Sequence, residues 1–301
     1  MVYTVTLNPA LDYVMRVDKL RYDDINRSQS EDIYYGGKGI NVSVILTRLG
    51  VENIALGFVG GFTGDKLIEM LENDGIRCDF NKLDRGSTRI NVKIKTDTPL
   101  DINAKGPDID ENQVRALLDK LTEIKKGDYL ILAGSVPDSL SDNIYERMLA
   151  KLKDKGVNFV VDATGDLLMK SLNYKPFLIK PNHHELGDLF GVKTESTEDI
   201  VKYAKKLQQL GARNVLVSRS KDGAILIDEN SNVTQVDNIE GKVVNSVGCG
   251  DSMVGGFVAG FIEQGDYAYA LKLGAACGNA TAFSEGLAQK SDIDEAFEFY
   301  N

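Results

Sequence analysis

The sequence predicts an α/β protein with a mostly parallel central sheet and a small β-sheet lid. Three observations carry this prediction. From residue 110 onward, strand-like and helix-like segments alternate regularly, which is typical of strands joined by helical crossovers. Residues 129–133 are continuously apolar, as in a strand that is buried on both faces. Residues 88–95 instead alternate between apolar and polar side chains, as in a sheet with two different faces.

The composition is that of an acidic globular protein. The 301 residues can bury a large core, and 43% hydrophobic with 27% charged residues is ordinary for such a chain. No internal repeat, low-complexity tract or linker interrupts it, so we expect a single domain over residues 1–301. The 35 Lys and Arg against 45 Asp and Glu give a net charge of −10, which argues against nucleic acid or an anionic membrane as a partner.

The cysteines and the hydropathy pattern indicate the compartment. Cys78, Cys249 and Cys277 are far apart and form no CxxC motif, which fits a reducing compartment and predicts neither disulfides nor a zinc site. We therefore expect a cytoplasmic protein. The first residues show neither a basic region nor a long apolar core, so we expect no signal peptide. No apolar run approaches the ~18 residues that a membrane span requires.

The first strand is expected at 3–7, where β-prone residues alternate before Asn8 and Pro9 stop the pattern. Asp12 follows shortly, near the carboxyl end of this strand, where open α/β sheets place their ligand contacts. Its carboxylate could accept hydrogen bonds from the hydroxyls of a substrate. A structural aspartate in a turn is the alternative.

A glycine-rich motif, GGKG at residues 36–39, precedes a helix that we expect at 40–49 and that Gly50 ends. Its glycines allow backbone N–H groups to approach a sugar or a phosphate, and Lys38 adds a positive charge. The spacing is not that of a Walker loop. Val42 stands where a dinucleotide-binding fingerprint needs its third glycine, which argues against a Rossmann oxidoreductase.

Residues 88–95 predict a strand with one apolar and one basic or polar face, which suits a sheet that covers something anionic. A solvated face of an antiparallel sheet is the alternative. A return strand is expected at 98–103, and we expect residues 12–36 and 87–104 to form the lid. The two faces of the strand are Ile90, Val92 and Ile94 against Arg89, Asn91, Lys93 and Lys95.

The remaining elements follow from their apolar periodicity and their glycine, proline and capping signals. Further strands are expected at 54–59, 157–161, 177–179, 215–218 and 224–227, with a hairpin-like turn at 220–223. Further helices are expected at 64–73, 110–124, 141–155, 197–209, 268–283 and 292–299.

A short helix is expected after Lys180-Pro181, and its entry carries Asn182 and Glu185 on one face. The pair has the spacing of a helix cap. It could also order the waters around Mg²⁺, which prefers oxygen ligands and keeps its waters. His183 and His184 are adjacent and cannot share a helix face, so they predict no metal pair.

A second glycine turn stands between a strand expected at 242–247 and an apolar helix that begins near Met253. The free N–H groups and the dipole at the start of such a helix form a phosphate site. Asp251 in this turn would repel an anion, so its presence needs a reason. It is either an N-cap or a general base that takes the proton of a hydroxyl attacking a phosphoryl group.

Three motifs thus occur in a fixed order: GGKGIN at 36–41, NHHE at 182–185 and VGCGDS at 247–252. Over essentially the whole chain the sequence resembles the PfkB (ribokinase-like) carbohydrate kinases. The resemblance implies a three-layer α/β/α sandwich with a β lid. TVTLNPALD at 4–12, TRIN at 88–91 and AGSVP at 133–137 are similar to the branch that acts on phosphorylated ketohexoses.

The resemblance also implies roles for single residues. Asp251 would be the catalytic base, and the N–H groups of Gly248, Cys249 and Gly250 the anion hole. The phosphosugar would be held by Asp12, Gly37, Lys38, Asn41 and Arg89, with Ser135 nearby. The nucleotide site would include Asn182, Ser218, Ser220, Asp222, Gly223, Gly250 and Asn279. Glu185, helped by Asn182, would position Mg²⁺ through water.

The reaction implied by the resemblance is ATP- and Mg²⁺-dependent phosphorylation of fructose 1-phosphate to fructose 1,6-bisphosphate, with tagatose 6-phosphate as the rival substrate. A catalytically silent sugar-phosphate sensor is the alternative from another class, although it requires a lost base, and Asp251 is present. An exposed lid edge offers a second copy of the chain a strand to pair with.

Two positions depart from the family pattern. Cys249 stands where the family usually has alanine or a similarly small residue. Its N–H is retained, so we expect an active enzyme that is sensitive to thiol reagents. The segment RSK at 219–221 replaces a turn that is usually richer in glycine and uncharged, which bears on the nucleotide contacts expected there.

Overall fold

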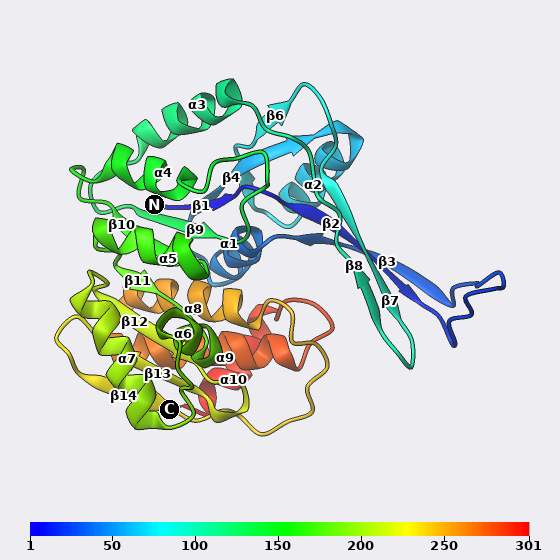
Figure 1. The fold of residues 1–301 in the computed structure, drawn as a ribbon. Coiled ribbons are helices and arrows are strands. Elements are labelled where there is room, and N and C mark those ends of the chain that lie inside the picture. The colour runs from blue at the N-terminus through cyan, green and yellow to red at the C-terminus, as the bar shows by residue number, and fades with distance from the viewer. Residues whose placement is uncertain (301) are drawn as a thin grey trace.

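The computed structural model describes residues 1–300 and is built around a 10-stranded sheet (Figure 1). Its strands are β1 (Val2–Thr6), β4 (Asn53–Gly60), β5 (Arg77–Cys78), β6 (Asn81–Leu83), β9 (Tyr129–Ala133), β10 (Asn158–Asp162), β11 (Leu178–Ile179), β12 (Asn214–Ser218), β13 (Ala224–Ile227) and β14 (Val233–Val236). The order is β14-β13-β12-β11-β10-β9-β1-β4-β5, with β6 paired to β4. Pairing is parallel except at β13 and β14, as the sequence predicts for a mostly parallel sheet.

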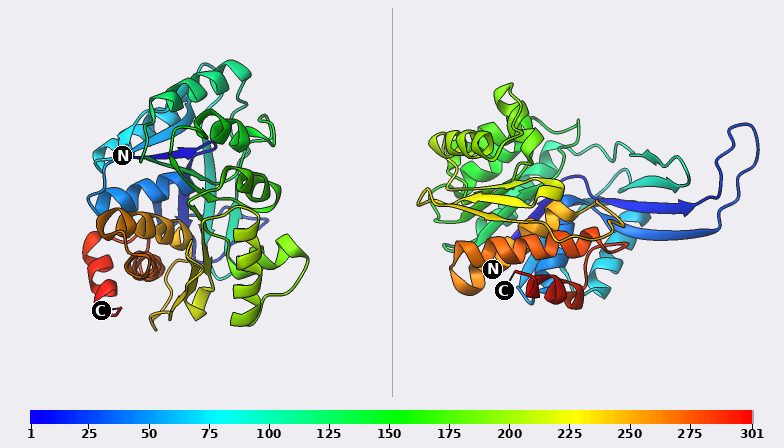
Figure 2. Two further views of the ribbon diagram at one scale, coloured as in Figure 1. Left: turned by 90° about the vertical axis from the view of Figure 1, so that its left-hand side faces the viewer. Right: turned by 90° about the horizontal axis from the view of Figure 1, so that it is seen from below.

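Helices cover both faces of this sheet, which confirms the three-layer α/β/α sandwich (Figure 2). One face packs against α3 (Glu111–Lys120), α4 (Ile144–Leu152), α5 (Gly165–Ser171), α6 (His183–Phe190) and α7 (Thr197–Gln209). The other packs against α1 (Lys38–Arg48), α8 (Cys249–Gln264), α9 (Tyr267–Ala282) and α10 (Lys290–Glu298). Helix α2 (Gly61–Asn73) packs beside α1, and short 3₁₀ turns are η1 (Leu121–Glu123), η2 (Leu172–Tyr174) and η3 (Ser220–Asp222).

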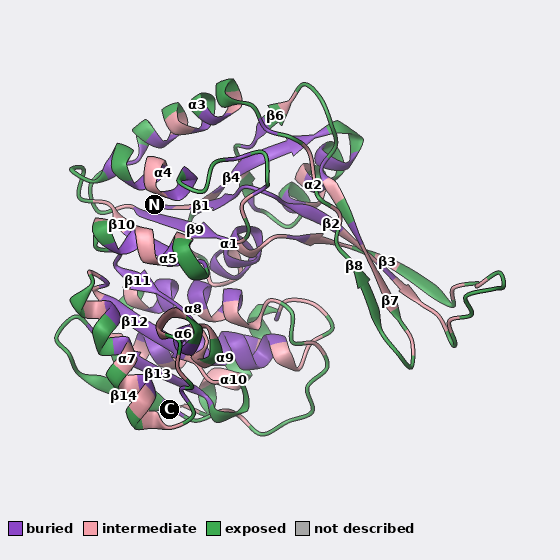
Figure 3. Cartoon of the chain, in the orientation of Figure 1, coloured by how far each residue is buried: buried purple, intermediate pink, exposed green. Residues whose placement is uncertain are grey.

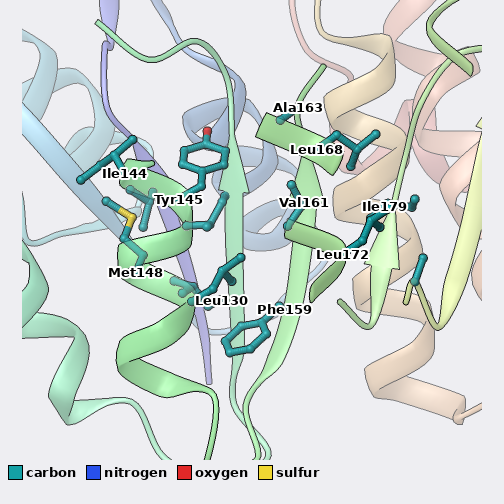
Figure 4. Packing of buried hydrophobic residues seen from close by; sticks show 14 of the residues in the cluster. Leu130, Ile144, Tyr145, Met148, Phe159, Val161, Ala163, Leu168, Leu172 and Ile179 are labelled. Carbon is teal, nitrogen blue, oxygen red and sulfur yellow. The ribbon is translucent and has the colours of Figure 1, made fainter. Parts of the chain in front are cut away.

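The core is a continuous apolar layer between the sheet and each set of helices. Figure 4 shows Leu130 and Val161 of the sheet packed against Tyr145 and Met148 of α4. All four side chains are at most 1% exposed. Each such side chain contributes about 1.5–3 kcal/mol relative to an exposed position, so this layer fixes the strands whose ends carry the site.

Helices α8 and α9 approach each other closely because small residues face the contact. A Cβ added to Gly256 would lie 2.6 Å from Cys277 Sγ, and one added to Gly274 would lie 2.8 Å from the Met253 carbonyl oxygen. Contacts this short exclude any larger side chain. The start of α8 is therefore held by a tightly packed partner.

The smaller sheet has the order β3-β2-β7-β8 and projects from the main body (Figure 1). Its strands are β2 (Ala10–Arg16), β3 (Ser30–Gly36), β7 (Arg89–Lys95) and β8 (Leu100–Ile102). They overlap the segments expected at 12–36 and 87–104, but β2 begins at Ala10, before the first segment. Figure 3 shows that the far end of this sheet is largely exposed. In β7 the polar Asn91 is buried, whereas the apolar Ile90 is exposed. The polar face of this strand therefore turns inward, and the alternative of a solvated polar face is wrong.

Two predictions about local structure are wrong. Residues 242–247 form no strand, and Val243, Val244 and Val247 are exposed in the segment that leads to α8. Their β-branched side chains favour a strand, but the N–H groups of Val244 and Asn245 donate to the carbonyl of Ala282 at the end of α9. Asp12 lies inside lid strand β2 and not in a turn after β1.

The structure contains, within residues 1–300, no helix with the length and apolarity that crossing a bilayer requires.

Candidate active site

A cavity of about 520 Å³ lies at the carboxyl ends of β1, β9, β11 and β12. This is where parallel α/β sheets place their ligands. The cavity gathers residues from the sheet, from the starts of α1, α6 and α8, and from the lid. Its lining is Thr6, Asn8, Gly37, Lys38, Asn41, Arg89, Gly134, Ser135, Lys180, Asn182, Glu185, Ser218, Val247, Gly248, Gly250 and Asp251.

Two helices begin at this cavity without a side-chain cap. Helix α1 begins after Gly37, whose φ is 132°, and helix α8 begins after Gly248, whose φ is 83°. The first helical hydrogen bond of α8 runs from the N–H of Ser252 to the carbonyl of Gly248. The preceding N–H groups, including those of Cys249 and Gly250, are the free donors of a helix start. Two positive helix ends therefore serve one cavity, which suits a ligand with several negative charges.

Asp251 lies in the first turn of α8 and is only 6% exposed. Its Oδ2 accepts a hydrogen bond of 2.8 Å from Nδ2 of Asn41 in α1. The side chain makes no cap bond to its own helix, so the N-cap alternative is wrong. Burial and the charge of Asp162 raise the pKa of Asp251 to about 6, against the opposing effect of Lys38. A carboxylate with this pKa is a competent proton acceptor near neutral pH.

A buried carboxylate, Asp162 at the end of β10, pairs with both lysines of the cavity. Its oxygens lie 3.2 Å from Lys38 Nζ and 3.4 Å from Lys180 Nζ. Burial alone would raise the pKa of Asp162, but attraction by the two lysines keeps it below its ordinary value. Sequence reasoning assigned no role to Asp162 or Lys180. Their positions directly after predicted strands are the signal that could have found them.

Arg89 reaches the cavity from lid strand β7. Its Nη1 donates to the carbonyl of Ala104 at 3.3 Å, but its Nε is buried without a hydrogen-bond partner within residues 1–300. Burial lowers the pKa of Arg89, which Asp12 only partly offsets. Arg89 is a half-buried cation, and its buried Nε is an unsatisfied donor that an anionic ligand would complete.

Asp12 stands on the inward face of the lid but not in the cavity wall. Its Oδ1 accepts from Nδ2 of Asn91 at 2.8 Å, and its Oδ2 lies 3.7 Å from Lys93 Nζ. The cavity wall also includes Ser135, as expected, and Thr6 and Asn8, which sequence reasoning missed. Both missed residues have a buried side-chain oxygen without a partner within residues 1–300.

Asn182 and Glu185 form the predicted capping box at the start of α6. The Asn182 side chain accepts from the N–H of Glu185 at 2.9 Å, and Oε2 of Glu185 accepts from the N–H of Asn182 at 2.8 Å. Both residues also line the cavity. Capping therefore occupies one oxygen of Glu185 and leaves the other for a water.

Four residues expected at a nucleotide site lie outside the cavity wall. Ser220, Asp222 and Gly223 form the tight turn between β12 and β13, and only Ser218 before it reaches the cavity. Asn279 is buried in α9, where its Nδ2 donates to the Ala275 carbonyl and to the Tyr300 hydroxyl, both at 2.9 Å. Its amide group is therefore used within the fold.

Cys249 begins helix α8 but its side chain does not line the cavity wall. Burial and the charge of Asp251 raise the pKa of the Cys249 thiol to about 11. The thiolate is the reactive form of cysteine, so almost none of it is present at neutral pH. The sensitivity to thiol reagents that we expected from the sequence stays a prediction, which the raised pKa of Cys249 does not favour.

Comparisons with known proteins agree with this geometry. The 1-phosphofructokinase of Bacillus subtilis is 44% identical over 295 residues, which cover 98% of this chain and 97% of the relative. The D-tagatose-1-phosphate kinase of Bacillus licheniformis is 38% identical over 297 residues, with 98% and 97% covered. Among solved structures, the crystal structure of phosphofructokinase-2 from Escherichia coli in complex with fructose-6-phosphate has a TM-score of 0.92 to this chain. The two sequences are 26% identical, and the match covers 99% of this chain and 98% of that protein.

The model of the family described as "pfkB family carbohydrate kinase" matches residues 5–294, which include the lid, both glycine turns and every residue of the cavity wall. With the motifs at 36–41, 182–185 and 247–252 brought to one cavity, the chain belongs to the pfkB family of carbohydrate kinases.

Proposed function

We propose that the protein phosphorylates fructose 1-phosphate to fructose 1,6-bisphosphate with ATP, as a 1-phosphofructokinase. The observation that carries the proposal is the position of Asp251. A carboxylate with a pKa of about 6 stands at the uncapped start of α8, inside a cavity that three cationic side chains enter. Phosphoryl transfer needs this combination of a proton acceptor, amide donors and positive charge.

In the proposed reaction, Asp251 accepts the proton of the sugar hydroxyl as that oxygen attacks the γ-phosphorus of ATP. The new O–P bond forms as the bond to the leaving ADP oxygen breaks. The N–H groups at the start of α8, including those of Cys249 and Gly250, stabilise the charge on the moving phosphoryl group. Asn41 orients Asp251 through its hydrogen bond.

The substrate phosphate would bind at the lid side of the cavity. Arg89 supplies a half-buried guanidinium whose buried Nε has no hydrogen-bond partner among residues 1–300, and Lys38 supplies a second cation. Asp12 and Asn91 on the inward face of the lid would contact sugar hydroxyls. We propose that the smaller sheet closes over the sugar and excludes water, which limits ATP hydrolysis.

Mg²⁺ belongs to the proposal because the donor set fits it. No group of three or more His, Cys, Asp or Glu side chains within residues 1–300 could hold a metal alone. Glu185 and Asn182 instead offer oxygens at the cavity wall, which suits an ion that keeps its waters and takes other ligands from phosphates. When bound, Mg²⁺ would neutralise charge on the phosphates of ATP. The nucleotide would extend along Ser218 toward Ser220, Asp222, Gly223 and Asn279.

Tagatose phosphates are the rival substrates. Fructose 1-phosphate and tagatose 6-phosphate both carry a phosphate at one end of a ketohexose and a free hydroxyl at the other, so the same cations and base serve both. Tagatose 1-phosphate differs from fructose 1-phosphate only in configuration at C4. The higher identity to a 1-phosphofructokinase, 44% against 38%, supports fructose 1-phosphate.

The deciding experiment is a coupled assay of ADP release with both tagatose phosphates, both fructose monophosphates and the unphosphorylated sugars. We expect the highest kcat/KM for fructose 1-phosphate. A higher value for a tagatose phosphate would transfer the proposal to that substrate. Binding of the phosphosugars without any ADP release would replace the kinase with a sugar-phosphate sensor.

We also propose that two copies associate through the smaller sheet and that the protein works in the cytoplasm. Edge strand β8 exposes Leu100 and Ile102, and the outward face of β7 exposes Ile90. All three cysteines are free, which suits a reducing compartment. Light scattering of the protein with and without Ile102→Lys tests the dimer. A monomeric mass for both the wild-type protein and the variant would contradict the dimer.

A further inference from the structure

The two lysines of the cavity share one carboxylate that the cavity does not reach. Lys38 and Lys180 both line the cavity, whereas Asp162 lies behind them with its side chain only 3% exposed. Each oxygen of Asp162 faces one ammonium group, at 3.2 and 3.4 Å. Burying a lone carboxylate costs several kcal/mol, so the two lysines are what allow Asp162 to stay ionised there.

We propose that Asp162 is a positioning residue for phosphoryl transfer, which holds Lys38 and Lys180 side by side and balances their charge next to Asp251. The inference rests on the proposed function, because it gives Asp162 a role in supporting Asp251 as the proton acceptor. It adds a residue outside the cavity wall to the groups that the reaction needs.

The geometry explains why a shared carboxylate is needed. Lys180 reaches the start of α8, because a Cβ added to Gly250 would lie 3.1 Å from Lys180 Nζ. Lys38 comes from the start of α1, and its Nζ lies 3.2 Å from the same carboxylate. Two ammonium groups this close repel each other unless an anion stands between them. Without Asp162, the lysines would separate, and the amide donors at Gly250 would lose their neighbouring cation.

The charges also set the proton affinity of the base. Two ammonium groups and the carboxylates of Asp162 and Asp251 sum to zero, whereas loss of the Asp162 charge leaves +1. Burial and Asp162 raise the pKa of Asp251, so removing that charge must lower it. The groups that face Asp251 from the surrounding elements are Lys38 and Asn41 of α1, Asp162 of β10, Lys180 after β11, Glu185 of α6 and Cys249 of α8.

Asp162→Asn tests the proposal through the pH dependence of kcat. We expect kcat at its plateau to fall by about 10–100-fold, because misplaced catalytic groups cost this much. The acidic limb of the profile should move by about one unit to lower pH, because Asp251 becomes the weaker base. A purely structural role would lower the folded fraction without moving this limb. The proposal would be overturned if the acidic limb stayed at the wild-type pH and kcat stayed within about twofold of the wild-type value.

Asp228→Asn is the matched control. Asp228 is also a buried aspartate, 5% exposed, but it accepts hydrogen bonds from the N–H groups of Asn230 and Asn232 in the turn between β13 and β14. We expect this variant to lose thermal stability and to keep the wild-type acidic limb. An equal shift of the limb in both variants would remove the specific role of Asp162.

Lys180→Met supplies a second test that does not depend on whether Asp162→Asn folds. It removes a cation near Asp251 and leaves Asp162 paired with Lys38. The acidic limb should therefore move to higher pH, opposite to the shift for Asp162→Asn. A limb that stays or moves to lower pH would contradict the charge balance.

The activity of the wild-type protein distinguishes a failure of the inference from a failure of the proposed function. If the wild-type protein releases no ADP with any phosphosugar, the kinase assignment fails and Asp162 has no reaction to serve. If the wild-type protein is active but the limbs of both variants coincide with its own, only the role of Asp162 fails.

Discussion

Asn41 Nδ2 donates a hydrogen bond of 2.8 Å to Asp251 Oδ2, which joins the starts of α1 and α8 across 210 positions of the chain. The bond holds Oδ2 of Asp251 in place. It leaves the other oxygen of this cavity-lining carboxylate available to accept a proton. It also links the two glycine turns into one structure, because each residue follows its turn within one helical turn. A site for proton and phosphoryl transfer therefore rests on a contact between two helix starts.

The turnover number should fall as the pH drops through about 6. Asp251 must be ionised to accept a proton, and burial with the Asp162 charge raises its pKa to about 6 in the folded protein. Below that pH the carboxyl is protonated and the base is lost, whereas above it activity reaches a plateau. The measurement is kcat from ADP release between pH 5 and 9 at saturating substrates. An acidic limb below pH 4.5 would place Asp251 at the ordinary pKa of an exposed aspartate.

Asp251→Asn should raise the thermal stability at pH 8. The pKa of Asp251 rises from 3.8 to about 6 on folding, so the ionised form costs on the order of 1–3 kcal/mol in the folded state. The cost is present at pH 8 and vanishes as the pH falls below about 4, where the carboxyl is protonated in both states. Calorimetry should show a Tm about 2–4 °C higher at pH 8 and a smaller difference at pH 4. A variant that is less stable at pH 8 would contradict the raised pKa.

Part of this site could be predicted from the sequence, because glycines and capping residues act locally. The turn before α8, the capping box of Asn182 and Glu185, and the alternation of β7 all rest on neighbouring residues. The contact of Asn41 with Asp251 depends on how two distant helices meet. No local pattern encodes it.

The residues that sequence reasoning missed lie at strand ends, where position is predictable but direction is not. Asp162 and Lys180 follow predicted strands, yet the pattern does not show that one turns behind the cavity and the other into it. The wrong strand at 242–247 has the same origin. Its valines have high β-propensity, but pairing depends on which sheet edge is free.

Arg89→Ala should raise the KM for the phosphosugar by about 10–100-fold and leave the KM for ATP nearly unchanged. The half-buried guanidinium lines the cavity, and its buried Nε has no partner in the described part of the chain. A charged hydrogen bond contributes about 1.5–3 kcal/mol. Steady-state kinetics with each substrate varied in turn measures both values. Arg115→Ala, an exposed arginine of α3, is the control and should keep both. An unchanged KM for the phosphosugar would remove Arg89 from the substrate site.

Gly248→Ala should lower kcat by at least about tenfold, whereas Gly265→Ala should leave it unchanged. Both glycines have positive φ, 83° and 65°, at the two ends of α8, so each substitution costs about 1–2 kcal/mol of backbone strain. At Gly248 a Cβ would also lie 2.7 Å from Leu287 Cδ2, whereas nothing lies within 4 Å at Gly265. Only the first change places this backbone strain at the amide donors of the site. Equal kcat values for the two variants would show that this turn does not position the phosphoryl group.

The most direct measurement of the central claim is the turnover of Asp251→Asn with fructose 1-phosphate and ATP, with nucleotide binding measured on the same sample. The substitution keeps the shape of the side chain and its contact with Asn41 but removes the proton acceptor. We predict a loss of about 10²–10⁴-fold in kcat while ATP still binds. Near-normal turnover in a folded variant that binds ATP would contradict the assignment of Asp251 as the base.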